Sequence, residues 1–234
     1  MRIARTLACT AVLLGLALPA RCDEGSQLVA RLNAGKPQVV VTYGTSLTAG
    51  GAWVGQLRDA LQTKYPGLAT VVNSGASGMW SKWGVDNLDA RVLRKKPDCV
   101  LIEFAINDAF LKYATPVEAA RTNLCNMIER IRGAKADTEI ILMTMDPPTG
   151  VHLERRPNIE AYYQMYRDVA KEQKLKLIDH EANWKKILEQ DKARFAKLVP
   201  DGIHPGPEGC RQVITPALLQ ALGLPAAPPA GGGK

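Results

Sequence analysis

The sequence predicts an α/β fold: a parallel sheet of about five strands with helices on both faces. Two observations lead to this prediction. Short β-branched runs alternate with longer amphipathic segments along most of the 234-residue chain. The first run, 38–42, is continuous and rich in β-branched residues, which is typical of a strand covered on both sides. Repeated strand–helix alternation is the pattern of a sheet whose strands are parallel.

The individual elements follow from these patterns. Strands are predicted at 38–42, 69–73, 98–105, 138–145 and 175–178. Helical periodicity predicts helices at 23–36, 53–65, 85–94, 115–131, 158–173, 181–190 and 208–221. Thr115 is expected to cap its helix, with Pro116 in the first position and Glu118 completing a capping box. Asn158 is expected to cap the next helix. Right-handed crossovers would bring the loops after the strands to one edge of the sheet.

The first residues have the pattern of a secretory signal peptide, which we place at 1–21. Arg2 and Arg5 supply the positive charge, and a short apolar stretch leads to the small-residue site at Pro19-Ala20. The stretch is too short to span a bilayer, and no other long apolar segment follows. We therefore expect an exported protein, secreted or periplasmic, with no membrane span.

The domain itself is predicted over 22–224. Arg21 is a poor fit to the small-residue motif that precedes a lipid-anchored cysteine, so anchoring at Cys22 is not expected. Residues 225–234 are rich in Pro, Ala and Gly, which predicts a disordered tail.

Charge and cysteine content exclude several classes of function. The formal net charge of +7 is spread along predicted helices and not clustered in an arm, so nucleic-acid binding is not expected. Cys99, Cys125 and Cys210 can form at most one disulfide, and free thiols are favoured for Cys99 and Cys125. No Cys-x-x-Cys pair is present, which argues against a zinc ribbon.

One stretch, 39–48, predicts a nucleophile. A β-branched run ends at Gly44 and turns at once toward a helical pattern, which would lift Ser46 to the carboxyl edge of the sheet. Open α/β folds bind their ligands at that edge. The alternative interpretation is that Thr45 or Ser46 only caps the helix that begins near Trp53.

The last loop supplies a matching base and acid. A serine hydroxyl needs a base, and the histidine side chain titrates near neutral pH. His204 is that candidate, and Asp201, three residues earlier, is close enough to orient its ring. The alternative is an ordinary surface turn leading into a helix.

Two further loops on the same edge offer donors for an oxyanion. The glycine-rich turn 73–78 could present a backbone N–H from Gly75 or Gly78. Asn107, after the third strand, could present its side-chain amide. Each is also common in ordinary turns.

Four blocks together resemble the SGNH, or GDSL-type, hydrolases. The blocks are Gly44-Thr45-Ser46-Leu47, Gly75-Ala76-Ser77-Gly78, Ala105-Ile106-Asn107-Asp108 and Asp201-Gly202-Ile203-His204. The resemblance extends from about residue 37 to 222. It implies a flavodoxin-like three-layer α/β/α sandwich and hydrolysis of ester, thioester or amide bonds without metal or cofactor.

The resemblance also implies a role for each matching residue. Ser46 would be the nucleophile, His204 the base and Asp201 the residue that orients it. The N–H groups of Ser46 and Gly78 and the amide of Asn107 would form the oxyanion hole. Gly78 is preferred to Gly75 because of its place in the family block.

The sequence departs from the family pattern at two positions. Thr45 stands where the family has Asp, and Ala105 stands where Gly is usual. Neither change removes a catalytic group, so both bear on rate and substrate shape rather than on reaction class.

Other active-site types fit less well. Thr48 stands where the α/β-hydrolase elbow has its second glycine, and no Gly-Lys-Ser/Thr follows the glycines. His152, His180 and His204 do not form a His-Glu-x-x-His metal site, and His180 is expected to be a structural residue. Glu103, on an apolar strand, is either a hydrogen-bonded buried acid or a support for the site.

The substrate is less well determined. Met79 and Trp80, with Trp83 nearby, could contact a sugar ring, although core packing is the commoner use of such side chains. The loop 146–156, with His152, Arg155 and Arg156, could border the substrate, although a solvated basic loop is the favoured interpretation. The sequence therefore favours a short-acyl esterase acting on glycan or other small esters. A lysophospholipase or thioesterase, or an inactive carbohydrate-binding protein, remains the alternative.

Overall fold

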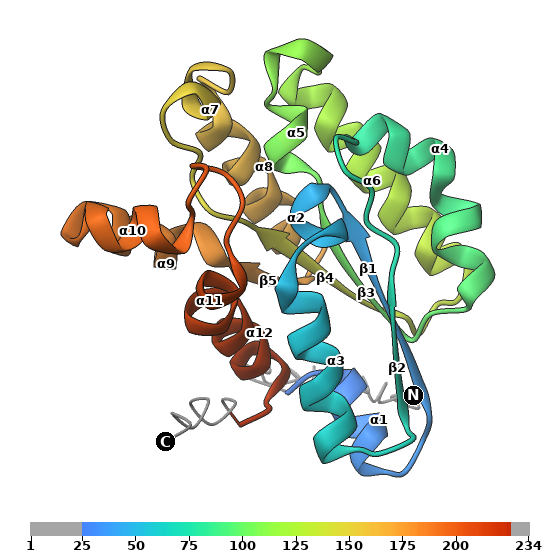
Figure 1. The fold of residues 1–234 in the computed structure, drawn as a ribbon. Helices are drawn as coiled ribbons and strands as arrows, with labels where there is room; N and C mark the ends of the chain where they lie inside the picture. Colours follow the sequence, from blue (N-terminus) through green and yellow to red (C-terminus); the bar gives the residue numbers. More distant parts are fainter. Residues whose placement is uncertain (1–24, 226–234) are drawn as a thin grey trace, which may run out of the picture.

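One parallel sheet of five strands organises residues 25–225, the part of the chain that the computed structural model describes (Figure 1). The strands are β1 (Gln38–Gly44), β2 (Ala69–Asn73), β3 (Cys99–Glu103), β4 (Glu139–Thr144) and β5 (Lys176–Asp179). Their order in the sheet is β2-β1-β3-β4-β5, and every neighbouring pair is parallel. This is the flavodoxin-like doubly wound order, with a topological switch point between β1 and β3. The predicted fold class is confirmed.

Helices cover both faces of this sheet. The longer ones are α1 (Gln27–Asn33), α3 (Ala52–Lys64), α4 (Ser81–Arg91), α6 (Val117–Ala134), α8 (Ile159–Glu172), α9 (His180–Gln190), α10 (Lys192–Leu198) and α12 (Thr215–Leu222). The short turns are α2 (Ser46–Ala49), α5 (Ala105–Asp108), α7 (Val151–Glu154), α11 (Pro207–Gly209), η1 (Leu93–Lys95), η2 (Leu111–Tyr113) and the π-helical η3 (Cys210–Ile214). Figure 1 shows α4, α6 and α8 on one face, with α3 and α12 on the other.

The central strands are buried on both sides, as their apolar sequences require. All five residues of β3 are buried, and six of the seven in β1 are buried. Helices α6 and α8 pack Leu124, Ile128 and Tyr166 against this sheet without exposure. Burying one such side chain contributes about 2 kcal/mol. The polar loops therefore lie at the ends of the strands, outside this buried core.

Three short helices at the carboxyl edge were not predicted. They are α2, α5 and α7, which lie together at the upper end of the sheet in Figure 1. The third strand, predicted over 98–105, ends at Glu103, so Ala105 and Asn107 belong to α5 and not to the strand. The α10 helix was also missed, and the helix predicted at 85–94 begins earlier, at Ser81.

The predicted capping box at Thr115 was wrong. Pro116 is the residue at the cap position, and α6 begins one residue later than expected, at Val117. Thr115 is thus one position too early to cap, and its hydroxyl donates to the carbonyl of Tyr113 at 3.5 Å. Asn158 does occupy the cap position of α8, but its side chain makes no capping hydrogen bond.

The signal peptide predicted at 1–21 and all but the first residue of the tail predicted at 225–234 lie outside the described residues. Within residues 25–225, no helix combines the length and apolar character needed to cross a bilayer. Cys99, Cys125 and Cys210 are all free thiols.

Candidate active site

The turn that carries Ser46 is built directly on the end of β1. The strand stops at Gly44, Thr45 adopts an extended conformation, and Ser46 is the first residue of α2. The hydroxyl of Thr45 accepts a hydrogen bond from the N–H of Leu47 at 3.2 Å. Thr45 therefore caps the short helix α2, not the longer α3, whose cap position is held by Gly51.

Glu103 anchors this turn from the neighbouring strand. Its buried carboxylate accepts hydrogen bonds from the N–H of Thr45 at 2.6 Å and from the hydroxyl of Thr48 at 2.7 Å. The Thr45 hydroxyl lies 3.0 and 3.1 Å from its two oxygens. Burial raises the pKa of Glu103 to about 7, although these hydrogen bonds oppose the shift. Of the two sequence-based interpretations of Glu103, the structure shows a hydrogen-bonded buried acid that also supports the Ser46 turn.

The structure brings Ser46, His204 and Asp201 together. The Ser46 Oγ lies 2.9 Å from Nε2 of His204, and Nδ1 of His204 lies 2.6 Å from Oδ2 of Asp201. Residues 158 positions apart in the sequence thus form one hydrogen-bonded chain. The separation that would have excluded the predicted triad, a His204 ring far from the Ser46 hydroxyl, is not found.

Asp201 is held in its charged form. The backbone N–H groups of His204 and Ile203 donate to its Oδ1 at 2.8 and 3.1 Å. Partial burial works to raise the pKa of Asp201, but the hydrogen bonds from the His204 ring and from the two N–H groups outweigh it and lower the pKa to about 2. A carboxylate this acidic is charged throughout the neutral range.

Gly202 shapes the turn between Asp201 and His204. Its φ is +84°, a left-handed conformation that favours glycine. A Cβ at this position would lie 2.7 Å from the Thr149 hydroxyl, and the Gly202 carbonyl accepts from the N–H of Thr149 at 2.8 Å. The loop after β4 thus packs against the turn that carries the base.

The two glycine candidates in the loop after β2 differ in how they are used. The N–H of Gly75 donates to the Asn73 side chain at 3.0 Å, and a Cβ on Gly75 would lie 2.5 Å from the backbone of Ala49. Gly75 therefore serves the packing of this loop against α2. Gly78 has a φ of +74°, and within residues 25–225 its N–H has no hydrogen-bond acceptor. The geometry favours Gly78 as the backbone donor.

Asn107 lies on α5, next to the same loop. Its Nδ2 donates to the carbonyl of Met79 at 2.9 Å, which leaves the second N–H of the amide for another acceptor. The carbonyl of Gly44 accepts from the N–H of Ala76 at 2.9 Å. These two bonds tie the ends of β1, β2 and β3 together, so the candidate donors border the Ser46 turn.

Two residues whose roles were not predicted, Tyr113 and Arg156, hold these donors in place. The Tyr113 hydroxyl donates to the carbonyl of Gly78. The guanidinium of Arg156 donates to Oδ1 of Asn107 at 3.2 Å. Arg156 is only 5 % exposed, so the expectation of a solvated basic loop was wrong at this position. No local pattern marks either residue, because both contacts join segments far apart in the sequence.

The predicted substrate-contact residues differ in environment. Trp80 is half-buried and stacks on Tyr113 with ring centroids 4.4 Å apart and planes 13° apart, and Met79 beside it is half-buried. Trp83 instead packs toward the core, 6.0 Å from the ring of Tyr43. Trp80 and Tyr113 form an aromatic surface beside Gly78, and Trp83 does not belong to it.

The histidines do not form a metal site. His180 is fully buried at the start of α9, and burial lowers its pKa to about 4. Residues 25–225 contain no group of three or more His, Cys, Asp or Glu side chains arranged to hold a metal ion.

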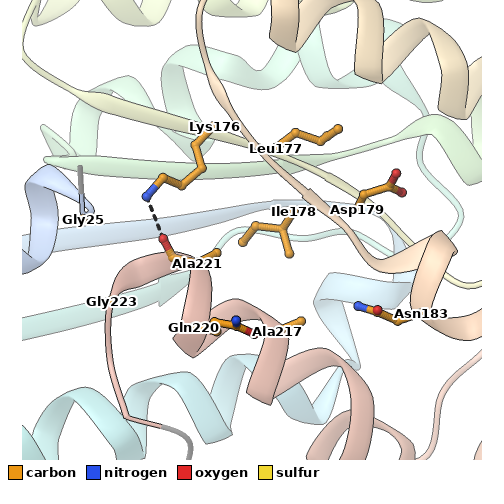
Figure 2. A pocket seen from close by; sticks show the side chains of 10 residues that line it. All are labelled: Gly25, Lys176, Leu177, Ile178, Asp179, Asn183, Ala217, Gln220, Ala221 and Gly223. Carbon is orange, nitrogen blue, oxygen red and sulfur yellow. Dashed lines mark hydrogen bonds between the residues drawn. The ribbon is translucent and has the colours of Figure 1, made fainter. Parts of the chain in front are cut away.

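Figure 2 shows a separate pocket of about 650 Å³ beside the edge strand β5. Its walls come from β5, α9 and α12, and the Lys176 ammonium crosses it to donate to the carbonyl of Ala221 at 2.6 Å. None of the residues predicted for the active site lines it.

Known proteins resemble this chain over most of its length. It is 27% identical to an arylesterase of Vibrio mimicus over 175 residues, which cover 72% of this chain and 80% of the relative. It is 30% identical to thioesterase 1/protease 1/lysophospholipase L1 of Escherichia coli K12 over 165 residues, covering 70% of this chain and 71% of the relative. The crystal structure of an acetylxylan esterase from Geobacillus stearothermophilus superposes with a TM-score of 0.70 at 23% identity, covering 82% of this chain and 97% of that one.

The family match spans the candidate site from end to end. Residues 41–212 match the model of the GDSL-like Lipase/Acylhydrolase family, and this range contains Ser46, Gly78, Asn107, Asp201 and His204. The chain therefore belongs to the GDSL-like lipase/acylhydrolase family and is a carboxylic ester hydrolase.

Proposed function

We propose that this protein is an exported serine esterase that removes short acyl groups, chiefly acetyl, from carbohydrate through an acyl-enzyme. The observation that carries the proposal is the hydrogen-bonded chain of Ser46, His204 and Asp201 beside the Asn107 amide. This arrangement supplies a nucleophile, a base, a charged partner for the base and a donor for an oxyanion.

The first half of the reaction uses the short contact between Ser46 and His204. The Nε2 atom of His204 takes the hydroxyl proton as Oγ attacks the ester carbonyl. Asp201 accepts the Nδ1–H of the ring, fixes its tautomer and balances the imidazolium charge. His204 then donates the proton to the leaving alcohol, and the acyl group stays on Ser46.

The second half repeats these steps with water. His204 takes a proton from a water molecule that attacks the acyl-enzyme, and returns it to Ser46 as the acid leaves. In both halves the oxyanion would be bound by the N–H groups of Ser46 and Gly78 and by the second N–H of Asn107. One such donor contributes about 3 kcal/mol to the stability of the transition state.

The carbohydrate part of the proposal is supported by the aromatic surface beside Gly78. Trp80 is half-buried, and its ring is fixed by Tyr113, which suits stacking on the apolar face of a sugar. The similarity to an acetylxylan esterase, 28% over 189 residues, points to the same substrate class. Export is supported by the signal-peptide pattern at 1–21.

Acetate release from acetylated xylo-oligosaccharides tests the activity and the substrate class together. The wild type should release acetate from these oligosaccharides and from p-nitrophenyl acetate, and Ser46→Ala should release none from either. An organophosphonate should label each chain once, on Ser46, as read by peptide mass. Label on another residue, or full activity in Ser46→Ala, would contradict the assignment.

Export has its own test. Expression of the full chain should give a mature protein outside the cytoplasm whose mass matches cleavage close to Arg21. Retention of residues 1–21 on a cytoplasmic protein would contradict export and leave the catalytic proposal unaffected.

A lipid or thioester substrate is the second candidate, favoured by three exposed apolar side chains near the site. Leu111 is 62% exposed, and Val151 and Leu153 on α7 are 48% and 46% exposed. The N–H of Leu111 donates to the carbonyl of Arg155, so the two segments are neighbours. A series of p-nitrophenyl esters distinguishes the candidates: kcat/KM should fall from acetyl to octanoyl for the carbohydrate esterase and rise for the lipid hydrolase.

A further inference from the structure

Arg156 connects the loop after β4 to the candidate oxyanion hole. Its side chain is almost fully buried and reaches α5, where Nε donates to the carbonyl of Ile106 at 2.7 Å and Nη2 donates to Oδ1 of Asn107 at 3.2 Å. A third, longer contact runs from Nη1 to the carbonyl of His152 at 3.4 Å. The guanidinium is thus fixed at three of its nitrogen atoms, against two segments of the chain.

We infer that Arg156 is the positioning residue of the oxyanion hole: its guanidinium fixes the orientation of the Asn107 amide and places a positive charge behind it. This inference rests on the proposed function of Asn107 as an oxyanion donor. It concerns a residue that neither contacts the reacting atoms nor lies in any of the four sequence blocks.

The amide of Asn107 can adopt only one orientation between its neighbours. Arg156 can only donate a hydrogen bond, and the carbonyl of Met79 can only accept one. The Oδ1 atom must therefore face Arg156, and Nδ2 must face Met79. Without the guanidinium, the Met79 carbonyl alone would hold the amide, and its second N–H would be less firmly aimed at the oxyanion.

The charge of Arg156 has no acidic partner in the described part of the chain. No carboxylate of residues 25–225 lies within ion-pair distance of it. The guanidinium instead lies over the ring of Phe110, 4.5 Å from its centroid. Burial lowers the pKa of Arg156, but an arginine remains charged at neutral pH.

An uncompensated charge of this kind favours the transition state over the bound substrate. The negative charge on the carbonyl oxygen exists only after Ser46 attacks, so Arg156 gains its electrostatic partner at that moment, through the polarised Asn107 amide. Interactions that strengthen only in the transition state raise kcat and leave KM unchanged. If Arg156 only stabilised the fold, the effect of replacing it would not be restricted to kcat.

A double-mutant cycle with Asn107 tests the inference. Arg156→Met should lower kcat on p-nitrophenyl acetate by about 10- to 100-fold with little change in KM, which is part of the 10²–10³-fold loss typical of a missing oxyanion donor. Asn107→Ala should show that full loss. The double variant should be no more than about threefold slower than Asn107→Ala alone, because both changes remove one function. Arg155→Met, at the exposed neighbouring position, is the matched control and should retain wild-type kcat.

Different results would contradict the inference about Arg156 and the proposed function. If the losses of Arg156→Met and Asn107→Ala multiply in the double variant, Arg156 acts elsewhere and the inference fails, while an inert Ser46→Ala still supports the proposed function. An active Ser46→Ala would overturn the proposed function itself.

Arg156→Lys replaces Arg156→Met in the cycle if the methionine variant fails to fold. Lysine keeps the positive charge but loses the planar set of donors, so a kcat between those of wild type and Asn107→Ala is expected. Unchanged kcat in Arg156→Lys would contradict the need for a fixed amide.

Discussion

Gly44 and Glu103 are register partners at the ends of β1 and β3, and the Glu103 carboxylate fills the space where a side chain at position 44 would stand. An ideal Cβ on Gly44 would lie 2.1 Å from Oε1 of Glu103 and 2.5 Å from its backbone oxygen. The glycine before Ser46 is therefore required by the buried acid beside it. The two residues together set the point at which β1 ends.

The first prediction concerns this contact. Gly44→Ala should displace Glu103 from Thr45 and Thr48, lower the free energy of unfolding by about 2 kcal/mol or more, and reduce kcat, because overpacking forces backbone shifts of this cost. Urea unfolding and p-nitrophenyl acetate hydrolysis measure the two effects. Gly55→Ala in α3 is the control: its Cβ would meet nothing closer than 3.8 Å, and stability should rise by up to about 1 kcal/mol. Wild-type stability in Gly44→Ala would refute the steric argument.

The second prediction separates the hydrogen bonds of Glu103 from its charge. Glu103→Gln can still accept from the N–H of Thr45 and the hydroxyl of Thr48, so kcat should stay within about threefold of wild type. Glu103→Ala leaves buried donors without a partner, at a cost of about 1–3 kcal/mol for each, and should lose stability and activity together. Equal losses in the two variants would show that the carboxylate charge, not its geometry, supports Ser46.

The third prediction gives the pH dependence of stability. The pKa of Glu103 in the folded protein is about 7, above its ordinary value of 4.5. A raised acid pKa means that the folded state binds the proton more tightly, so stability is greatest below about pH 4.5 and falls as pH rises through 7. The loss amounts to about 3 kcal/mol for this group. Unfolding free energies of wild type and Glu103→Gln, measured from pH 5 to 8.5, should diverge by that amount, with the wild type losing more.

Asp108 provides a second case of the same sign. It is the last residue of α5, where Ser81 at the start of α4 donates to it, and burial raises its pKa to about 6. Asp108→Asn should therefore remove a smaller part of the loss of unfolding free energy with rising pH. That part should be centred at a lower pH than the part that Glu103 contributes. A Glu103→Gln profile parallel to that of wild type would contradict the assignment of the slope to Glu103.

The fold was predictable from the sequence because local and global preferences agree. Continuous β-branched runs such as 39–42 can be buried only in a sheet covered on both faces, and each is followed by an amphipathic segment. Element ends were harder. The strand predicted at 98–105 ends at Glu103 because the backbone turns into α5 at Phe104, whose carbonyl accepts from the N–H groups of Asn107 and Asp108.

The candidate site was predictable only in part. Ser46, Asn107 and His204 each follow a recognisable turn at the carboxyl edge, where parallel strands gather their loops. Arg156 lies in a basic stretch that looks solvated, and only the folded chain shows that its side chain turns inward to Asn107. The roles of the site residues stay predictions that the variants above and below test.

The fourth prediction concerns Asp201. Its pKa of about 2 means that it stays charged at every pH at which an esterase is assayed. Asp201→Asn should lower kcat by about 10²–10⁴-fold through loss of the charge that balances the His204 imidazolium, with KM little changed. The loss should persist at every pH from about 7.5 to 9, because Asp201 is charged throughout that range. A kcat in Asp201→Asn within about threefold of wild type would contradict the need for the charge.

The fifth prediction separates the two functions of the Tyr113–Trp80 pair. The Tyr113 hydroxyl holds the Gly78 carbonyl, while its ring supports Trp80. Tyr113→Phe keeps the stack and loses the hydrogen bond, so kcat should fall by about 3- to 10-fold on every ester, as expected for about 1 kcal/mol. Trp80→Ala should raise KM for acetylated oligosaccharides and leave p-nitrophenyl acetate unaffected.

Tyr65→Phe is the matched control for the lost hydroxyl, because its partner Asn33 lies on α1, away from the site. It should change neither kinetic constant. If Tyr113→Phe behaves like Tyr65→Phe, the Gly78 carbonyl needs no anchor and the loop is held by Asn107 alone. If Trp80→Ala impairs p-nitrophenyl acetate as much as the oligosaccharides, Trp80 supports the loop that carries Gly78 and does not bind sugar.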